Sequence, residues 1–289
     1  MSVTQKKFNR RKFLSSLGIL GIGTAATGAY GKVIGAEALE LGEHRILISN
    51  VPGQKPLKIL QLSDLHASET VSLDFIQRAV NLGLESRPDL ICLTGDYITR
   101  KYDQWERYAD ILAPLAAAAP TYATLGNHDG GRWCRQHLDG YNDTEEVRKL
   151  LEKSQIKLLD NSVEQVDLRD WKINLAGLGD VWAKEFSPEK TFKNVSATSG
   201  RHTVVLSHNP DTKDALKNHP WDLMLCGHTH GGQVRLPLVG APISPVRDKR
   251  FVQGLHRWDN RWIHITKGVG NLYGLRINCR PEVSLLTLV

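Results

Sequence analysis

Short apolar segments rich in β-branched residues alternate along most of the chain with segments of helical periodicity. Apolar residues at positions 73, 76, 79, 80 and 84 predict a helix over Leu73–Glu85. The segments predicted as strands are Lys58–Ser63, Asp89–Thr94, Thr121–Leu125, Lys172–Ala176, Thr203–Ser207 and Asp222–Cys226. This alternation is typical of an α/β protein with a largely parallel sheet.

The remaining pattern predicts further elements. A helix through Trp105–Leu112 is expected to stop near Pro114, and another, capped by Asp143 or Thr144, to run to about Lys153. The last part of the chain is rich in strands, with a hairpin across Asp259-Asn260 and a final strand at Glu282–Val289. No repeat or second linker interrupts the series, which therefore predicts one domain.

Five of the predicted strands end at side chains that can bind metals or transfer protons. These side chains are Asp64, His66, Asp96, Asn127, His128, His208, His228 and His230. In open α/β sheets, sites form in the crevice beyond the carboxyl ends of the strands, so we expect all eight around one cleft. Imidazole and oxygen ligands together favour Zn, Mn, Fe or Ni over Ca.

The spacing of these residues predicts how they bind. In Asp64-x-His66 and His228-x-His230, alternation along an extended segment would turn both side chains toward one ion. The two oxygens of Asp96 can bridge two ions about 3.5–4 Å apart, as in two-metal hydrolases. A pair of divalent ions held by so few carboxylates keeps a net positive charge, which suits a phosphate ester anion.

Charge and cysteine content exclude two classes of protein. The chain has 37 Lys+Arg and 31 Asp+Glu, but six basic residues and no acid lie within residues 1–36. The other 253 residues therefore carry equal numbers of each sign, which argues against a nucleic-acid-binding face. Four cysteines are too few for a disulfide framework. A single disulfide between Cys134 and Cys279 is not excluded by the sequence.

Residues 1–38 have the layout of a signal segment. Arg10 and Arg11 precede the uncharged stretch Phe13–Gly31, which is followed by Ala36-Glu37-Ala38, and the paired arginines resemble a twin-arginine export signal. We therefore expect recognition by the twin-arginine translocation machinery and export to the periplasm or the outer face of the cytoplasmic membrane. The alternative is a membrane anchor, since 19 helical residues rise about 28 Å.

The ordered motifs of residues 58–289 resemble those of the calcineurin-like metallophosphoesterases. The motifs are Asp64-x-His66, Gly95-Asp96, Gly126-Asn127-His128-Asp129, Ser207-His208 and Gly227-His228-Thr229-His230. The twin-arginine start and the closing Gly-x-Arg276-x-Asn-x-Arg280-Pro281-Glu282 are most similar to bacterial exported phosphodiesterases of that family. The resemblance implies a four-layer α/β/β/α sandwich over residues 39–289.

The resemblance also implies roles for the site residues. Asp64, His66, Asp96 and His230 would bind one ion, and Asp96, Asn127, His208 and His228 the other, with Mn²⁺ favoured among the candidate metals. His128 would not be a ligand but the acid that protonates the leaving oxygen, with Asp129 orienting its ring. Arg276 could contact phosphate or lie behind the ligands, and Asp180 could line the cleft or cap a turn.

The predicted function is hydrolysis of phosphate diesters by in-line attack of a hydroxide that bridges two metal ions. One alternative is a pyrophosphatase of a UDP-linked glycolipid such as UDP-2,3-diacylglucosamine, which an apolar groove beside the metals would favour. The other is a scaffold without enzyme activity, although such proteins usually lose ligands and here all positions are filled. Monoester hydrolysis stays open, because the surroundings of the metals select among esters.

Overall fold

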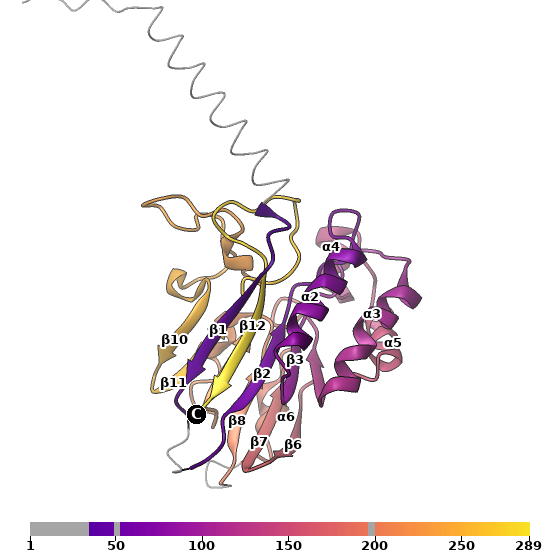
Figure 1. Ribbon diagram of the computed structural model, residues 1–289. Helices are drawn as coiled ribbons and strands as arrows, with labels where there is room; N and C mark the ends of the chain where they lie inside the picture. Colours follow the sequence, from indigo (N-terminus) through magenta and orange to yellow (C-terminus); the bar gives the residue numbers. More distant parts are fainter. Residues whose placement is uncertain (1–34, 49–52, 196–199) are drawn as a thin grey trace, which may run out of the picture.

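Two six-stranded sheets packed face to face form the centre of the protein (Figure 1). The computed structural model describes residues 35–48, 53–195 and 200–289. The first sheet has the order β1 (Glu40–Ile46), β12 (Glu282–Leu288), β2 (Leu57–Leu62), β3 (Leu90–Thr94), β4 (Thr121–Thr124) and β5 (Lys157–Leu158). The second has the order β10 (Gly254–Trp258), β11 (Arg261–Ile265), β9 (Leu223–Cys226), β8 (His202–Leu206), β7 (Trp171–Gly177) and β6 (Ser162–Leu168).

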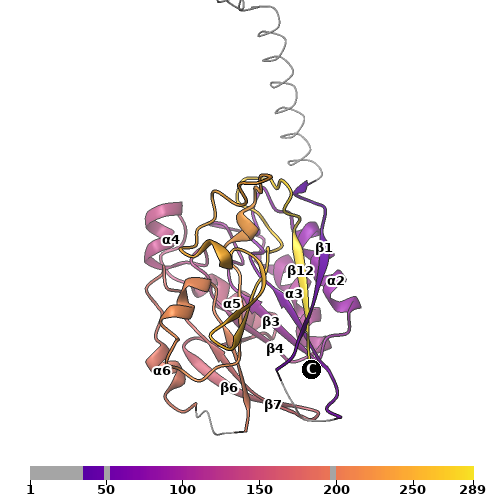
Figure 2. The ribbon, with the colours of Figure 1, turned by 90° about the vertical axis from the view of Figure 1, so that its left-hand side faces the viewer.

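Helices cover the outer faces of both sheets, as the two views in Figures 1 and 2 show. The helices against the first sheet are α2 (Leu73–Glu85), α3 (Trp105–Ala118) and α5 (Glu145–Lys153), and α4 (Gly131–Leu138) lies near the end of β4. The second sheet is covered by α6 (Pro188–Phe192) and by the short 3₁₀ segments η2 (Pro210–Asp214) and η4 (Lys249–Phe251), whereas the 3₁₀ segment η3 (His230–Gly232) follows the end of β9.

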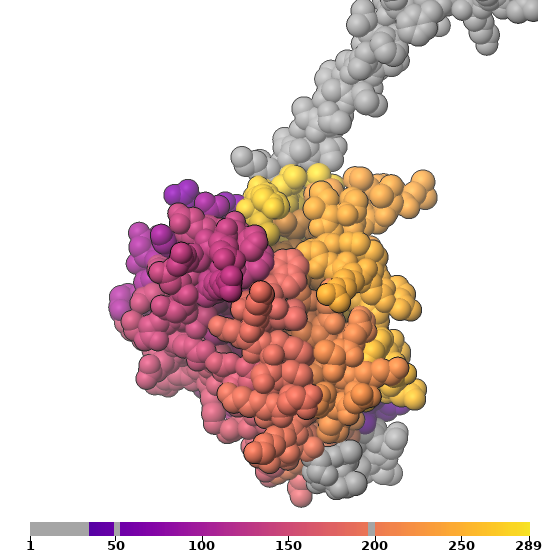
Figure 3. All heavy atoms as spheres, turned by 180° about the vertical axis from the view of Figure 1, so that it is seen from behind, coloured from indigo at the N-terminus to yellow at the C-terminus, as the bar shows by residue number. Residues whose placement is uncertain are grey.

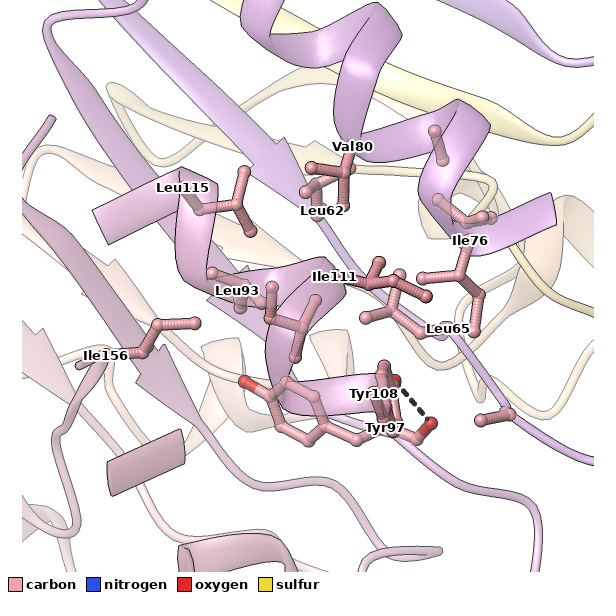
Figure 4. Close-up of a cluster of buried hydrophobic side chains, with 14 of the residues drawn as sticks. Leu62, Leu65, Ile76, Val80, Leu93, Tyr97, Tyr108, Ile111, Leu115 and Ile156 are labelled. Carbon is pink, nitrogen blue, oxygen red and sulfur yellow. Dashed lines mark hydrogen bonds between the residues drawn. The ribbon is translucent and has the colours of Figure 1, made fainter. Parts of the chain in front are cut away.

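Three apolar clusters separate the four layers. The first fills the space between the first sheet and its helices (Figure 4), where Leu62 and Leu93 of the strands meet Ile76 of α2 and Leu115 of α3. The second lies between the two sheets, and the third between the second sheet and its outer covering. The single-domain α/β/β/α sandwich implied by the sequence motifs is therefore confirmed.

Strand direction determines where the functional residues gather. Strands β2, β3 and β4 run parallel in the first sheet, as do β7, β8, β9 and β11 in the second. The carboxyl ends of both sets lie together, because Gln61 of β2 donates a hydrogen bond of 2.9 Å to the carbonyl of Cys226 at the end of β9. The loops that leave these strands thus meet over one edge of the sandwich.

Most predicted elements are confirmed, and the end of one helix differs. The Asp259-Asn260 hairpin is present, with positive φ of 50° and 65° at its two central residues, as a tight type I′ turn requires. The prediction that the helix stops near Pro114 was wrong, because α3 continues to Ala118. The extra turn brings Leu115 into the first apolar cluster, and this packing offsets the hydrogen bond that proline removes. Helix α4 was not predicted.

The predicted export segment lies mostly outside the described residues, since residues 1–34 are not among them. The membrane-anchor alternative for residues 13–31 concerns the same segment. Within residues 35–48, 53–195 and 200–289, no helix combines the length and the apolar character that crossing a membrane requires.

Candidate metal centre

The structure brings all eight predicted site residues together. Asp64 and His66 follow β2, Asp96 follows β3, Asn127 and His128 follow β4, His208 follows β8, and His228 and His230 follow β9. Every one of these side chains is buried. Residues spread over 167 positions of the sequence thus form one compact cluster at the carboxyl ends of the strands.

Their ligand atoms form two groups that share Asp96. In the first group, His230 Nε2 lies 3.1 Å from His66 Nε2 and 3.3 Å from Asp64 Oδ1. In the second group, His208 Nε2 lies 3.1 Å from Asp96 Oδ2 and 3.3 Å from His228 Nδ1. Asp96 Oδ2 also lies 3.5 Å from His66 Nε2, so the carboxylate joins both groups.

These separations fit bound cations. Two ligands about 2.1 Å from one ion, roughly at right angles, lie about 3 Å apart, close to the distances within each group. Several polar atoms of the centre have no hydrogen-bond partner among the described residues: both amide atoms of Asn127, Nε2 of His228 and Nδ1 of His230. Buried polar atoms normally have partners, and a metal ion would satisfy the amide oxygen of Asn127. The ring nitrogens that converge in the two groups are instead Nδ1 of His228 and Nε2 of His230.

Backbone carbonyls orient two of the histidine rings. His208 Nδ1 donates to the carbonyl of Thr94 at 2.7 Å, and His128 Nδ1 donates to the carbonyl of Thr99 at 2.9 Å. With Nδ1 of each ring bound to a carbonyl, Nε2 is the ring nitrogen left to act within the cluster. For His208 this is the usual arrangement behind a metal-binding histidine.

Left-handed backbone, not strand alternation, aims the side chains. Asp64, His66, Asp96, His228 and His230 all have positive φ, between 50° and 68°. The prediction that the Asp64-x-His66 and His228-x-His230 pairs converge through extended alternation was therefore wrong. Positive φ is uncommon outside glycine, and such residues gather at functional sites where the surroundings stabilise them.

Glycines allow the loops to approach one another. A Cβ atom on Gly126 would lie 2.2 Å from Asp96 Oδ1, and one on Gly227 would lie 2.0 Å from Ser63 Oγ and 2.2 Å from Asp64 Oδ2. Both contacts are far inside van der Waals distance. The glycines before Asn127 and His228 are thus required by the close packing of the two loops against the carboxylates.

Burial keeps several rings in the neutral form that metals bind. It lowers the pKa of His66 to about 3 and holds the pKa of His228 and of His230 well below the ordinary value. It also raises the pKa of Asp64 to about 6. Burial opposes ionisation of Asp96 as well, but the neighbouring His208 and its hydrogen bond hold the pKa of Asp96 well below the ordinary value.

Asp129 holds the loops rather than the ring of His128. Its carboxylate accepts backbone N–H bonds from Asp96 (2.9 Å), Tyr97 (2.7 Å) and Gly126 (2.7 Å). The predicted orienting contact to His128 is therefore wrong, because the carbonyl of Thr99 makes it. Asp129 instead ties the loop after β3 to the loop after β4.

Arg276 also acts behind the site. Its side chain is fully buried, and its guanidinium donates to the carbonyls of His230 (3.4 Å), Lys267 (2.8 Å), Gly268 (2.9 Å) and Gly270. The alternative in which Arg276 contacts phosphate is thus wrong, because the side chain is fully buried and both terminal nitrogens donate to backbone oxygens. The buried arginine instead holds the loop that carries His230.

Two further expectations are resolved. Asp180 caps a turn, since its Oδ1 accepts N–H bonds from Trp182 (2.7 Å) and Ala183 (2.9 Å).

Cys134 and Cys279 do not form a disulfide. Their thiols donate instead to the carbonyls of His128 and His230, respectively, each at 3.2 Å.

An apolar cleft opens beside the centre, which sequence reasoning missed. It has a volume of about 290 Å³ and reaches Asp96, Asn127 and His128 at its floor. Its walls include Trp133, Leu138, Trp182, Val234, Ile243, Pro245, Leu272, Tyr273 and Leu275. The ring of Trp182 stands edge-on to His228 with centroids 4.3 Å apart. No local pattern signals these residues, because they come from three separate loops and from α4.

Comparison with known proteins identifies the class. Residues 57–232 match the family described as calcineurin-like phosphoesterases, and this span contains every residue of the two groups of candidate metal ligands. The chain belongs to this family and is a metal-dependent phosphoric ester hydrolase.

Individual relatives agree with this assignment. The phosphodiesterase YaeI of Escherichia coli is 41% identical over 97% of this chain and 99% of its own length, which confirms the predicted similarity to a bacterial phosphodiesterase of this family. The uncharacterized metallophosphoesterase YkuE of Bacillus subtilis is 31% identical over 98% of both chains. The UDP-2,3-diacylglucosamine pyrophosphatase LpxG of Chlamydia muridarum is 27% identical over 80% of this chain and 83% of its own.

Proposed function

We propose that this protein is a phosphodiesterase whose centre binds two divalent metal ions. The observation that carries the proposal is the position of Asp96, whose Oδ2 lies within 3.5 Å of ring nitrogens from both groups. A single shared carboxylate is the hallmark of two-metal hydrolases. The likeness to YaeI, named a phosphodiesterase, supports diesters as the substrate class.

The ligand sets follow the two groups. One ion is bound by Asp64, His66, Asp96 and His230. The other is bound by Asp96, Asn127, His208 and His228. When bound, the ions place positive charge against the phosphate oxygens and lower the pKa of a water molecule toward about 7. Imidazole-rich sets suit Mn²⁺, Fe, Zn²⁺ or Ni²⁺, and we favour Mn²⁺.

His128 is the residue that delivers the proton. Its Nδ1 is occupied by the carbonyl of Thr99 at 2.9 Å, and the residue forms part of the floor of the cleft. Nε2 is therefore the ring atom available to protonate the oxygen that leaves phosphorus. The fixed ring also directs that proton without further reorganisation.

A second candidate is cleavage of a pyrophosphate in a UDP-linked glycolipid. The apolar cleft beside the ligands favours this activity, and LpxG relatives carry it in their name. The higher identity and fuller coverage of YaeI favour the diesterase.

Metal analysis with parallel assays separates these candidates. Purified protein is analysed for metals and assayed with bis(4-nitrophenyl) phosphate, 4-nitrophenyl phosphate and a UDP-linked lipid. We expect about two ions per chain, hydrolysis of the diester well above the monoester, and loss of both ions and activity after exhaustive chelation. Full activity without metal, or a clear preference for the monoester, would contradict the proposal.

We also propose export through the twin-arginine pathway, supported by Arg10, Arg11 and the uncharged stretch that follows. Residues 1–40 fused to a reporter that is active only outside the cytoplasm are expected to give activity. The conservative double change Arg10→Lys/Arg11→Lys should abolish it, because the translocase reads the arginine pair rather than its charge. Activity that survives the change would assign export to another route or to a membrane anchor.

A further inference from the structure

The loop between Arg235 and Arg247 presents apolar side chains to solvent beside the cleft. Its eleven residues, 236–246, contain no charged side chain. Leu238 is fully exposed, and Val239 and Ile243 are 66% and 74% exposed. Figure 3 shows this orange segment projecting from the upper corner of the protein. Exposed apolar residues gathered on one projection mark an interaction surface.

The tip of the loop is built as a fixed turn. The backbone N–H of Leu236 donates to the carbonyl of Gly240 at 2.8 Å, and the reverse bond is 2.9 Å long. Leu238, inside this turn, has φ of +66°. Glycine or asparagine adopts that conformation at lower cost, so turn formation alone does not account for a leucine there. The turn holds an apolar side chain away from the protein.

The loop, the cleft and the start of the described chain all lie at one end of the sandwich. Ile243 and Pro245 of the loop form part of the cleft wall. β1 runs antiparallel to β2 through β12, so Gly35 lies at the end where β2 delivers its metal-binding residues (Figure 1). In the sequence, the uncharged stretch 13–31 ends four residues before Gly35.

From this placement we propose that residues 236–246 insert into a lipid bilayer, so that the centre acts on phosphodiesters of amphiphilic molecules at the membrane surface. The substrate part of the proposal rests on the proposed phosphodiesterase function. An apolar tip flanked by two arginines matches the boundary between acyl chains and anionic head groups. The uncharged stretch before Gly35 supports a bilayer as the occupant, because it would keep this end of the protein near a membrane.

The surroundings of the centre suit both halves of an amphiphile. The apolar cleft accepts a hydrocarbon chain that leaves the bilayer next to the loop. A second hollow of about 630 Å³ shares Leu272 with it and is lined by polar residues that include Thr99, Arg100 and Lys101. A phosphate between the two hollows would have its polar substituent on one side and its chain on the other.

Fluorescence tests the docking loop without reference to activity. All four native cysteines are buried, so Leu238→Cys in the full-length protein offers one exposed thiol for a polarity-sensitive nitrobenzoxadiazole label. Vesicles of phosphatidylethanolamine and phosphatidylglycerol should raise its emission several-fold. The matched control is Leu47→Cys, which is exposed at the opposite end of β1 and should not respond. The docking proposal is overturned if vesicles leave the emission of the label at position 238 unchanged. It is also overturned if they raise the emission of a label at position 47 by the same factor.

Two esters with the same reacting group test the substrate. Wild-type protein is compared on 4-nitrophenyl hexadecyl phosphate in the same vesicles and on soluble 4-nitrophenyl ethyl phosphate. We expect kcat/KM to be at least about tenfold higher for the hexadecyl ester. Leu238→Ser/Val239→Ser should remove that advantage but leave kcat/KM for the ethyl ester within about twofold of the wild-type value. Leu47→Ser should change kcat/KM for neither ester.

The outcomes distinguish the two proposals. Equal rates on both esters, or an advantage that the loop variant retains, overturn the membrane-presented substrate while the phosphodiesterase function stands. Failure of the metal-loaded protein on both esters overturns the phosphodiesterase function and the substrate proposal with it. The label at position 238 still decides in that case whether the loop meets the bilayer.

Discussion

Asp96→Asn is expected to strip both metal ions and abolish hydrolysis. The change removes a negative charge that lies within 3.5 Å of His66 and His208, one from each group. Residues that only support metal ligands typically contribute 10- to 100-fold to metal affinity. Loss of the shared ligand should therefore lower the affinity of each of the two metal sites by more than about 100-fold. Metal analysis after dialysis against a defined Mn²⁺ concentration measures the loss directly.

Asp180→Asn is the matched control for this experiment. Asp180 is another buried carboxylate, and an asparagine keeps the oxygen that accepts the N–H groups of Trp182 and Ala183. Its variant should retain both ions and most of the activity. If the Asp96 variant binds two ions as tightly as the wild type, the shared-ligand assignment is wrong.

His128→Ala is expected to lower turnover by about 10²–10⁴-fold on a diester with a poor leaving group, the usual contribution of a general acid. Both ions should remain, because the role assigned to His128 is proton transfer and not metal binding. The effect should shrink for 4-nitrophenyl esters, whose leaving group needs little protonation. Comparing kcat on an alkyl and a 4-nitrophenyl diester, with metal content measured in parallel, checks both statements.

A histidine on nearby α4 provides the control. His137 is exposed and stacks against Trp133, whose ring lies near His128. His137→Ala should therefore leave turnover on both substrates within about twofold. Loss of one ion from the His128 variant would instead make His128 a ligand, and unchanged kcat with the alkyl diester would remove it from the mechanism.

The elements that carry the site were largely predictable from local pattern. Helix α2 has the bounds that its apolar spacing predicted, and the strands before Asp64, Asp96 and His208 begin and end within a residue or two of their predicted limits. Each apolar strand is recognisable because its side chains fill continuous layers on both faces of a sheet. The polar residue that follows a strand is recognisable for the same reason, since it breaks the run.

The means by which the side chains converge were not predictable. Positive φ at Asp64 and His66 replaces the expected alternation, and it is stabilised by contacts with distant loops, such as the N–H of Asp64 donating to the carbonyl of Gly95 at 2.9 Å. The roles of Asp129 and Arg276 depend equally on backbone groups far away in the sequence. Such partners leave no signature in the residues next to the motif.

The sequence by itself thus determined the chemistry: which strands form, which side chains follow them, and that these suit two metal ions and a phosphate ester. Only the tertiary structure decided the surroundings, namely the carbonyl that orients His128, the buried arginine behind His230, and the apolar cleft with its projecting loop. The physical reason is the range of the interactions. Periodicity and turn preference act between near neighbours in the chain, whereas a cleft and its supports arise where segments separated by a hundred residues or more are packed together.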